Sequence, residues 1–432
     1  MFADLSIGEK IRLIRKDRGY SLENVAKDAN CSIATISRLE RSETDVDDVT
    51  MYAIRRALGV EKAPLTTPEC EQYMGRMMVW GQLMSSLRID EARAMVTEMS
   101  AILQLPYERS LSLLYTQMEI RLLCHDICNM PLVKKMLAES EHCFDEMGED
   151  AHHLFFSNKG LLAYQQEDFR NALKYMFTAL TYQCQVSKGR ESDLFTYIGM
   201  IYLRMARIHF AIMYFEQARQ AFGGDLTNPA LASIETNLAT GYIQIGEFEK
   251  GRVLVENALA HARRTNLTVG IGISYCNLAE IQRGKGDLDE AIRHVDNSLY
   301  QLKNMGAMYM IPLYYKTIYL YELKRTCECL SLAKEGLALA KADGSELFIL
   351  QFETQCHLAT LKDPEAENFI ENIAIPRLRE LYELNYALYY CEKLEEHYKK
   401  KKSGKKALTM AAIARDIYKE MFSAIDYDTA NA

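Results

Sequence analysis

Apolar side chains recur every three or four positions along most of the chain, which is the spacing of amphipathic helices. In the first sixty residues this pattern predicts four short helices, over residues 7–17, 22–28, 33–40 and 49–58, followed by a short fifth helix or an extended linker before the prolines. Ser21 and Ser32 stand directly before the second and third of these, where a hydroxyl caps a helix N-terminus. With only 8 prolines and 22 glycines in 432 residues, breaks are few, and we expect an all-α protein.

The second and third predicted helices resemble the helix-turn-helix of the phage-repressor (XRE) family. The resemblance covers about residues 6–60 and rests on the segment SLENVAKDANCSIATISRLERS. Val25 and Ala26, the turn at Asn30, and the run from Ile36 to Glu40 fall where that family has them. A small residue such as Ala26 lets the second helix cross the third closely, and the third helix of such a motif lies in the DNA major groove.

This resemblance implies a set of DNA-facing residues. Ile36 and Leu39 face the core, and Arg38 is the candidate for a bidentate guanine contact. Ser21 and Ser32 are expected to contact phosphates. The full set of expected DNA contacts is Ser21, Ser32, Ile33, Ala34, Thr35, Ser37 and Arg38.

Four further positions can be compared with the family pattern. Arg15 and Glu40 occupy the positions of a structural ion pair in the family. Leu22 stands where the family often has glutamine, which removes one phosphate contact, and Ser42 stands where glycine is common.

The prolines in the stretch from Ala63 to Pro68 predict a linker. We therefore expect a DNA-binding domain at residues 1–62, a linker at 63–68, and a second domain at 69–425. Within the second domain a pattern repeats: its first small residue is Gly160, Gly199, Ala239 and Ala279, which are 39 or 40 residues apart. Further small residues follow on the next predicted helix of each copy, at Ala172, Ala211, Gly251 and Ala291 and then at Ala179, Ala218, Ala258 and Ser298.

This repeat resembles the tetratricopeptide repeat, although the usual period is about 34 residues. Weaker copies on both sides extend the array to about nine helical pairs. The resemblance implies a right-handed superhelix whose concave groove is lined by the first helix of each pair.

The groove residues follow from the repeat register. One equivalent position of the first helix holds Asn158, Tyr197, Asn237 and Asn277, and seven residues later on the same face come Gln165, Arg204, Gln244 and Gly284. Amides both donate and accept hydrogen bonds, which suits contacts to a peptide backbone. We expect a short peptide to contact Asn158, Gln165, Tyr197, Arg204, Asn237, Gln244 and Asn277; the alternative is that these are merely tolerated polar residues.

Composition narrows the function classes. The net charge of −8 argues against a protein that coats nucleic acid indiscriminately. The 11 cysteines lack zinc-finger spacing, so we expect reduced thiols, no metal and no cofactor. We find no P-loop and no catalytic triad, and expect no enzymatic activity. No apolar run approaches the roughly 18 residues of a membrane span, and early charges such as Asp4 and Glu9 exclude a signal peptide, so we expect a cytoplasmic protein.

A helix-turn-helix followed by tetratricopeptide repeats resembles the RRNPP quorum-sensing regulators of Gram-positive bacteria, with the layout of NprR-type members. The resemblance implies a homodimer that binds operator DNA and a pheromone peptide, with dimer contacts through either the C-terminal repeats or the N-terminal domains. Two alternatives remain: a Rap-like switch that binds a response regulator, and a regulator without a peptide ligand.

Overall fold

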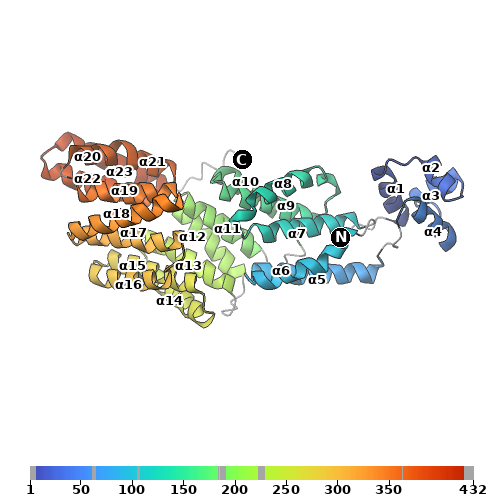
Figure 1. The fold of residues 1–432 in the computed structure, drawn as a ribbon, viewed down its shortest axis with the longest axis horizontal. Helices are drawn as coiled ribbons and strands as arrows, with labels where there is room; N and C mark the ends of the chain where they lie inside the picture. Colours follow the sequence, from blue (N-terminus) through green and yellow to red (C-terminus); the bar gives the residue numbers. More distant parts are fainter. Residues whose placement is uncertain are drawn as a thin grey trace. The chain divides into compact units, whose positions relative to one another are not determined.

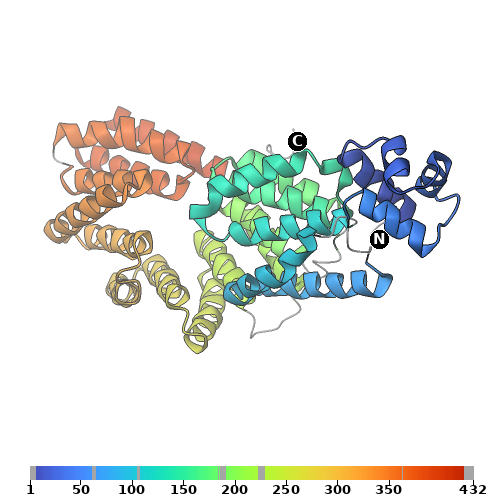
Figure 2. The ribbon, with the colours of Figure 1, turned by 45° about the vertical axis from the view of Figure 1, so that its right-hand side comes forward.

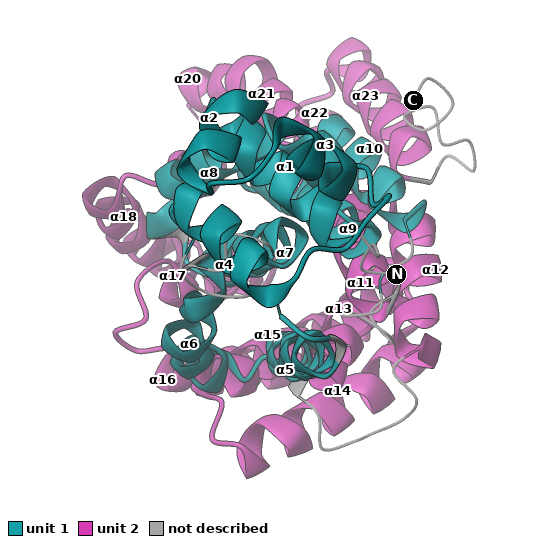
Figure 3. Ribbon diagram, turned by 90° about the vertical axis from the view of Figure 1, so that its right-hand side faces the viewer, with its two compact units in different colours: residues 1–188 teal, residues 189–432 magenta. Residues whose placement is uncertain are grey.

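The computed structural model of the chain describes residues 6–60, 65–104, 108–182, 184, 191–221, 229–361 and 363–422. Every regular element within these ranges is helical, as predicted (Figure 1 and Figure 2). The chain divides into two compact units, residues 1–188 and 189–432 (Figure 3). This division falls inside the repeat array and not at the predicted linker.

The N-terminal four helices match the predicted spans closely. They are α1 (Ile7–Asp17), α2 (Leu22–Asp28), α3 (Ile33–Glu40) and α4 (Asp48–Ala57). A capping box between Ser6 and Glu9 starts α1, and Ile11, Ile36 and Ile54 are fully buried in one small apolar core. Ser42, after α3, has a φ of 59°, the left-handed conformation in which glycine is favoured.

Three helical pairs complete the first unit. They are α5 (Thr67–Ser85) with α6 (Ile89–Met99), α7 (Arg109–Leu123) with α8 (Met130–Glu141), and α9 (Glu149–Gln165) with α10 (Phe169–Leu180). Three short 3₁₀ turns accompany them: η1 (Ser100–Gln104), η2 (Ile127–Asn129) and η3 (Phe144–Glu146).

The predicted linker is shorter than expected. Helix α5 begins at Thr67 and includes Pro68, because a proline in the first turn of a helix removes no intrahelical hydrogen bond. Residues 61–64 lie outside the described part of the chain. Glu108 contacts residues on both sides of this segment. Lys10 Nζ of α1, before the segment, lies 2.9 Å from Glu108 Oε1, and Leu65 N, after it, donates to the same oxygen.

Six helical pairs form the second unit. The first helices are α11 (Glu191–Arg204), α13 (Pro229–Gln244), α15 (Thr268–Gly284), α17 (Ala307–Glu322), α19 (Glu346–Ala359) and α22 (Leu384–Lys400). Their partners are α12 (Ile208–Ala221), α14 (Phe248–Arg264), α16 (Leu288–Gln301), α18 (Thr326–Asp343), the segmented helix α20 (Pro364–Phe369), η4 (Ile370–Ala374) and α21 (Ile375–Glu380), and α23 (Gly404–Phe422). With the three pairs of the first unit, the described chain holds the nine pairs that the sequence predicts.

Small residues hold the paired helices close together, as predicted. A Cβ built on Gly199 would lie 2.7 Å from a ring atom of Phe215 on α12, and one on Gly160 would lie 2.9 Å from Met176 on α10. At the equivalent positions Ala239 and Ala279 are fully buried. The small residues of the repeat pattern thus mark the positions at which the two helices of a pair are in close contact.

The second unit also joins its first and last pairs. Helix α12 contacts α23, and Arg207, in the turn between α11 and α12, donates to the backbone carbonyl oxygen of Glu420. The first helices contact one another in order, α11 with α13, α13 with α15, α15 with α17 and α17 with α19. Neighbouring first helices from α11 to α19 therefore lie side by side in the second unit.

Candidate functional site

Helix α3 presents one buried and one open face. Its core face holds Ile36 and Leu39, at 0% and 1% exposure. Ser32 caps the helix, since its Oγ accepts from Thr35 N at 3.0 Å. In the same way Ser21 Oγ accepts from Asn24 N at 3.1 Å at the start of α2.

The residues expected to contact DNA lie on the open face or at its edge. Arg38 is exposed and forms no ion pair with any other described residue, so its guanidinium is available to a ligand. Of the other expected contacts, four are also exposed, namely Ser21, Ser32, Ile33 and Ala34. Thr35 and Ser37 are half-buried. The predicted residues thus lie on α3 and at the N-caps of α2 and α3, and each of them is exposed or half-buried.

The expected ion pair between α1 and α3 is present. Arg15 Nε lies 2.6 Å from Glu40 Oε1 and Arg15 Nη2 lies 2.8 Å from Oε2. Their side chains are 12% and 5% exposed, and the hydrogen bond to Glu40 raises the pKa of Arg15 against the opposing effect of burial. This two-point contact fixes α1 against α3 and faces away from the open surface of α3.

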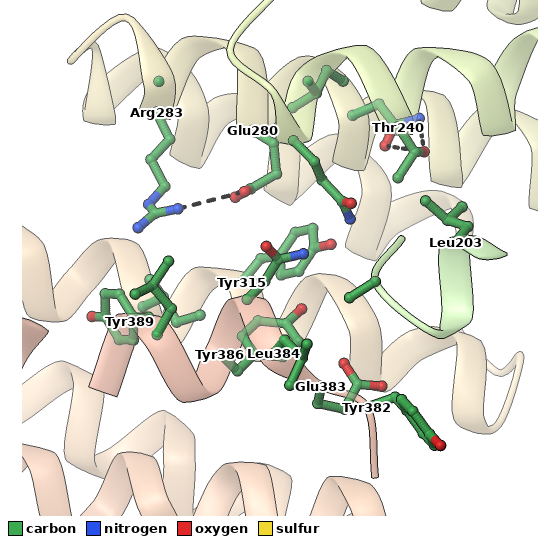
Figure 4. A pocket seen from close by; sticks show the side chains of 18 of the residues that line it. Leu203, Thr240, Glu280, Arg283, Tyr315, Tyr382, Glu383, Leu384, Tyr386 and Tyr389 are labelled. Atoms are coloured by element: carbon green, nitrogen blue, oxygen red, sulfur yellow. Dashed lines mark hydrogen bonds and ion pairs between the residues drawn. The ribbon is translucent and has the colours of Figure 1, made fainter. Parts of the chain in front are cut away.

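A cavity of about 660 Å³ lies in the second unit (Figure 4), within the range of about 300–1,000 Å³ typical of ligand pockets. Its walls come from α13, α15, α17 and α22, from the end of α11 with the turn after it, and from the start of α14. Its polar lining includes the Thr240 and Asn277 side chains, which exchange hydrogen bonds of 3.3 to 3.5 Å. The Oε1 atom of Gln244 is buried and has no described hydrogen-bond partner.

Three of the seven residues expected to contact a peptide line this cavity: Arg204, Gln244 and Asn277. Gly284, at the same repeat position as Gln244, also lines it. Tyr197 and Asn237 are half-buried and do not belong to the lining.

The other two expected peptide contacts, Asn158 and Gln165, belong to the first unit. Gln165 is exposed, whereas Asn158 is fully buried. Arg121 Nε donates to Asn158 Oδ1 at 2.8 Å, and Asn158 Nδ2 donates to the Gln117 carbonyl oxygen at 2.8 Å. Asn158 therefore joins two helical pairs, in contrast to the open placement that the sequence suggested.

Most of the charged and aromatic lining was not predicted. Glu280 lies one turn and Arg283 nearly two turns after Asn277 on α15, and Tyr386 and Tyr389 lie on α22, far away in sequence. Asn277, Glu280 and Gly284 are spaced so that they share one face of α15, and this spacing could have identified the lining residues on that helix. The repeat pattern contains no such signal for α22.

The cavity holds a charged network. Arg283 Nη2 and Nε lie 2.8 and 3.0 Å from the two carboxylate oxygens of Glu322, and Arg283 Nη1 lies 3.5 Å from Glu280. Burial lowers the pKa of Arg283, but the bonds to Glu322 and the charge of Glu280 raise it overall. The guanidinium also lies over the ring of Tyr389, 5.6 Å from its centroid.

Residues 11–65 match the family model described as helix-turn-helix. The transcriptional activator NprA of Geobacillus stearothermophilus is 21% identical over 409 residues, which cover 92% of this chain and 99% of NprA. In the described part of the chain no helix is long and apolar enough to cross a membrane.

Among solved structures, a Rap protein complexed with competence and sporulation factor superposes with a TM-score of 0.70 at 16% identity, covering 81% of this chain and 98% of that one. The apo form of the quorum sensor NprR from B. thuringiensis gives 0.63 at 17% identity, with 81% and 99% covered. NprR with its cognate peptide NprX gives 0.60 at 18% identity, with 80% and 99% covered. The chain therefore combines an N-terminal helix-turn-helix with the helical-repeat fold of the Rap and NprR proteins, the architecture of the RRNPP regulators that its sequence resembles.

Proposed function

We propose that the chain is a peptide-responsive transcription regulator that acts in the cytoplasm as a homodimer. In this proposal α3 binds operator DNA and the cavity of the second unit binds a short signalling peptide. The observation that carries it is the presence on one chain of an open, unpaired Arg38 on α3 and of a polar ligand-sized cavity. The full-length likeness to NprA, a transcriptional activator, supports the first half, and the fold of NprR, which is known in complex with a peptide, supports the second.

The alternative Rap-like role, binding of a response regulator, has less support. Likeness to Rap structures concerns the fold of the repeats, and the helix-turn-helix at residues 11–65 adds a module whose open face suits DNA. A dimer suits DNA because one small domain buries little surface, and two-fold operators match two-fold proteins.

The DNA half of the proposal is tested by Arg38→Ala. A bidentate arginine–guanine contact contributes about 1–3 kcal/mol of discrimination, so the variant should lose roughly tenfold or more in operator affinity. Footprinting of the chain on DNA upstream of its own gene, followed by titration at fixed salt, measures this. Arg41→Ala is the control, since Arg41 pairs with Glu43 at the surface; equal affinities of the wild type and the Arg38 variant would refute the assignment of α3.

The peptide half is tested by Gln244→Ala and Asn277→Ala. Each removes a polar group from the cavity, and a lost hydrogen bond to a peptide costs about 1 kcal/mol, or roughly fivefold in affinity. Isothermal titration with a synthetic peptide selected for binding to the full chain measures the effect. Asn237→Ala is the matched control, because Asn237 occupies the repeat position of Asn277 but does not line the cavity. A uniform response of all three variants would argue against peptide binding there.

A further inference from the structure

Helix α4 has one face that the rest of the described chain leaves open. Its inner face places Ile54, at 0% exposure, in the apolar core of the N-terminal four helices. On the outer side Val49 is 78% exposed and Tyr52 is 59% exposed. Arg56 is also exposed, and positions 49, 52 and 56 follow one another on a single helical face. Large apolar side chains gathered on one open face indicate an interaction surface.

The two ends of this face carry opposite charges. Asp45 and Asp48 lie at the N-terminal end of α4, and Arg55 and Arg56 lie in its last turn. None of these four side chains forms an ion pair with another residue of the described chain. They cannot neutralise each other within the helix, because Asp48 and Arg56 are separated by about 12 Å along its axis. The charges at both ends of α4 therefore remain available to a partner.

This face is complementary to a second copy of itself. In an antiparallel pair of α4 helices with the two-fold axis near Tyr52, Asp48 of each copy lies beside Arg56 of the other. Val49 and Tyr52 of both copies then pack in the middle, out of water. A two-fold contact uses the same patch twice, so each attraction occurs twice. The two helix dipoles also run in opposite directions, which favours the antiparallel arrangement.

Other occupants match only part of the face. A phosphate backbone or an acidic protein would suit the arginines but would be repelled by Asp45 and Asp48 at the other end. A basic partner would meet the opposite conflict at Arg55 and Arg56. A surface with an apolar centre and opposite charges at its two ends is matched at every point by an antiparallel copy.

We propose that α4 forms the two-fold contact between the DNA-binding domains of the homodimer, through Val49, Tyr52 and reciprocal pairs of Asp48 with Arg56. The proposal rests on the proposed function and identifies the surface that joins the two domains. A single helix of 10 residues buries less than the roughly 1,200 Å² of a stable interface. The contact therefore forms between domains that the rest of the dimer already holds close together. Once formed, it fixes the spacing of the two α3 helices and hence of the DNA half-sites.

Photocrosslinking in the full chain tests the contact directly. Tyr52→p-benzoylphenylalanine keeps an aromatic ring at the two-fold axis and bonds to its neighbour on illumination. An isotope-labelled chain mixed with an unlabelled chain distinguishes a bond between copies from a bond within one copy, and mass spectrometry locates it. We expect residue 52 of one copy to be linked to α4 of the other. A bond to any other element in its place would overturn the proposal.

Charge reversal tests the reciprocal pairs. Asp48→Arg brings like charges together at both ends of the contact, and Arg56→Asp does the same with the opposite sign. Each variant alone should lower the yield of the crosslink by about tenfold, since two surface attractions become repulsions. A dimer of one variant with the other restores both pairs, so the crosslink between them should return. Because a misfolded domain would not be rescued by mixing, an unchanged yield or a failed rescue would refute the pairing.

The matched control is Asp28→Arg, which makes the same exchange at an exposed residue at the end of α2. It should leave the yield of the α4 crosslink unchanged. A loss equal to that of Asp48→Arg would mean a general charge effect and would count against the contact.

Sedimentation of the full chain separates failure of this inference from failure of the proposed function. If the chain is a dimer but residue 52 is not linked to a second α4, only the assignment of the contact is wrong. If the chain is a monomer, both free and on the DNA that it protects in footprinting, the proposed homodimer is wrong and the α4 contact is refuted with it.

Discussion

At the scale of single residues, the pair of Arg15 and Glu40 decides how firmly α3 is held. Both side chains are mostly buried, at 12% and 5% exposure. Removing one partner of a buried pair leaves the other charge uncompensated, at a cost of about 3 kcal/mol or more. We therefore expect Glu40→Gln to speed amide hydrogen exchange in α1 and α3 of the full chain by about a hundredfold.

Glu43→Gln provides the comparison for this prediction. Glu43 pairs with Arg41, and the two side chains are 50% and 55% exposed, so its loss should change stability by less than about 1 kcal/mol. Hydrogen-exchange mass spectrometry resolves the two cases. Unchanged protection of α3 in Glu40→Gln would show that apolar packing alone positions the DNA-facing helix.

The same scale shows why some site residues were predictable and others were not. The placement of Ser32, Ile36 and Arg38 follows from one helical period within a short segment, so the sequence predicted which of them are buried and which are exposed. Asn158 and Asn277 share one repeat position, yet their surroundings differ. Asn158 meets Arg121, whereas Asn277 meets Thr240 beside the cavity. The repeat register predicts which way a side chain points from its helix. The side chains of the neighbouring helical pair decide whether it meets a buried partner or an open cavity.

At the scale of elements, small residues set the distance between paired helices. A Cβ on Gly199 would lie 2.7 Å from the buried ring of Phe215, and overpacking of this kind costs about 1–3 kcal/mol. We expect Gly199→Ala to lower the free energy of unfolding of the second unit by that amount, measured as an earlier urea transition of the tyrosine signal.

Gly404→Ala is the control for this packing argument. Gly404 opens α23, and a Cβ there meets nothing within 4 Å, so the change should be neutral or, through the higher helix propensity of alanine, slightly stabilising. If both alanine variants unfold alike, the recurring small residues are not packing contacts.

Prediction at this scale worked because helix pairing is local in sequence. The described chain has its nine pairs where the small-residue register places them, including the weak copies at both ends. The segmented helix from Pro364 to Glu380 belongs to one of the weaker copies, and Pro376 follows its π-helical turn at Ile370–Ala374. Sequence reasoning placed Pro68 in the linker because a proline in the interior of a helix breaks it. A proline in the first turn of a helix is tolerated equally well, so its presence alone does not separate the two cases.

At the scale of the whole molecule, the second unit has a contact between its first and last pairs that no local sequence pattern predicts. In the second unit the last pair returns to the first, so that α22 supplies one wall of the cavity and the end of α11 with the turn after it supplies another. Contacts between residues about two hundred positions apart depend on the summed rotation of every intervening pair. The sequence therefore predicted Arg204, Gln244 and Asn277 of the lining but not the tyrosines and carboxylates of α22.

This contact between the first and last pairs should affect the shape of the cavity. Arg207 donates to the carbonyl oxygen of Glu420 in the last turn of α23, where a cation also interacts favourably with the helix dipole. Arg207→Ala should loosen the contact of α12 with α23 and widen the cavity. We expect the bound peptide to lose about three- to tenfold in affinity, together with faster hydrogen exchange at the C-terminal end of α23.

Arg379→Ala separates this joining effect from a general loss of charge. Arg379 Nη2 lies 3.2 Å from Glu420 Oε2, but α21 and α23 both belong to the last pairs, so that variant leaves the contact between the two ends intact. If Arg379→Ala weakens peptide binding as much as Arg207→Ala does, the joined ends do not shape the site. If only Arg207→Ala does so, a peptide that fills the cavity must favour the joined state, because a ligand stabilises whichever state it binds more tightly.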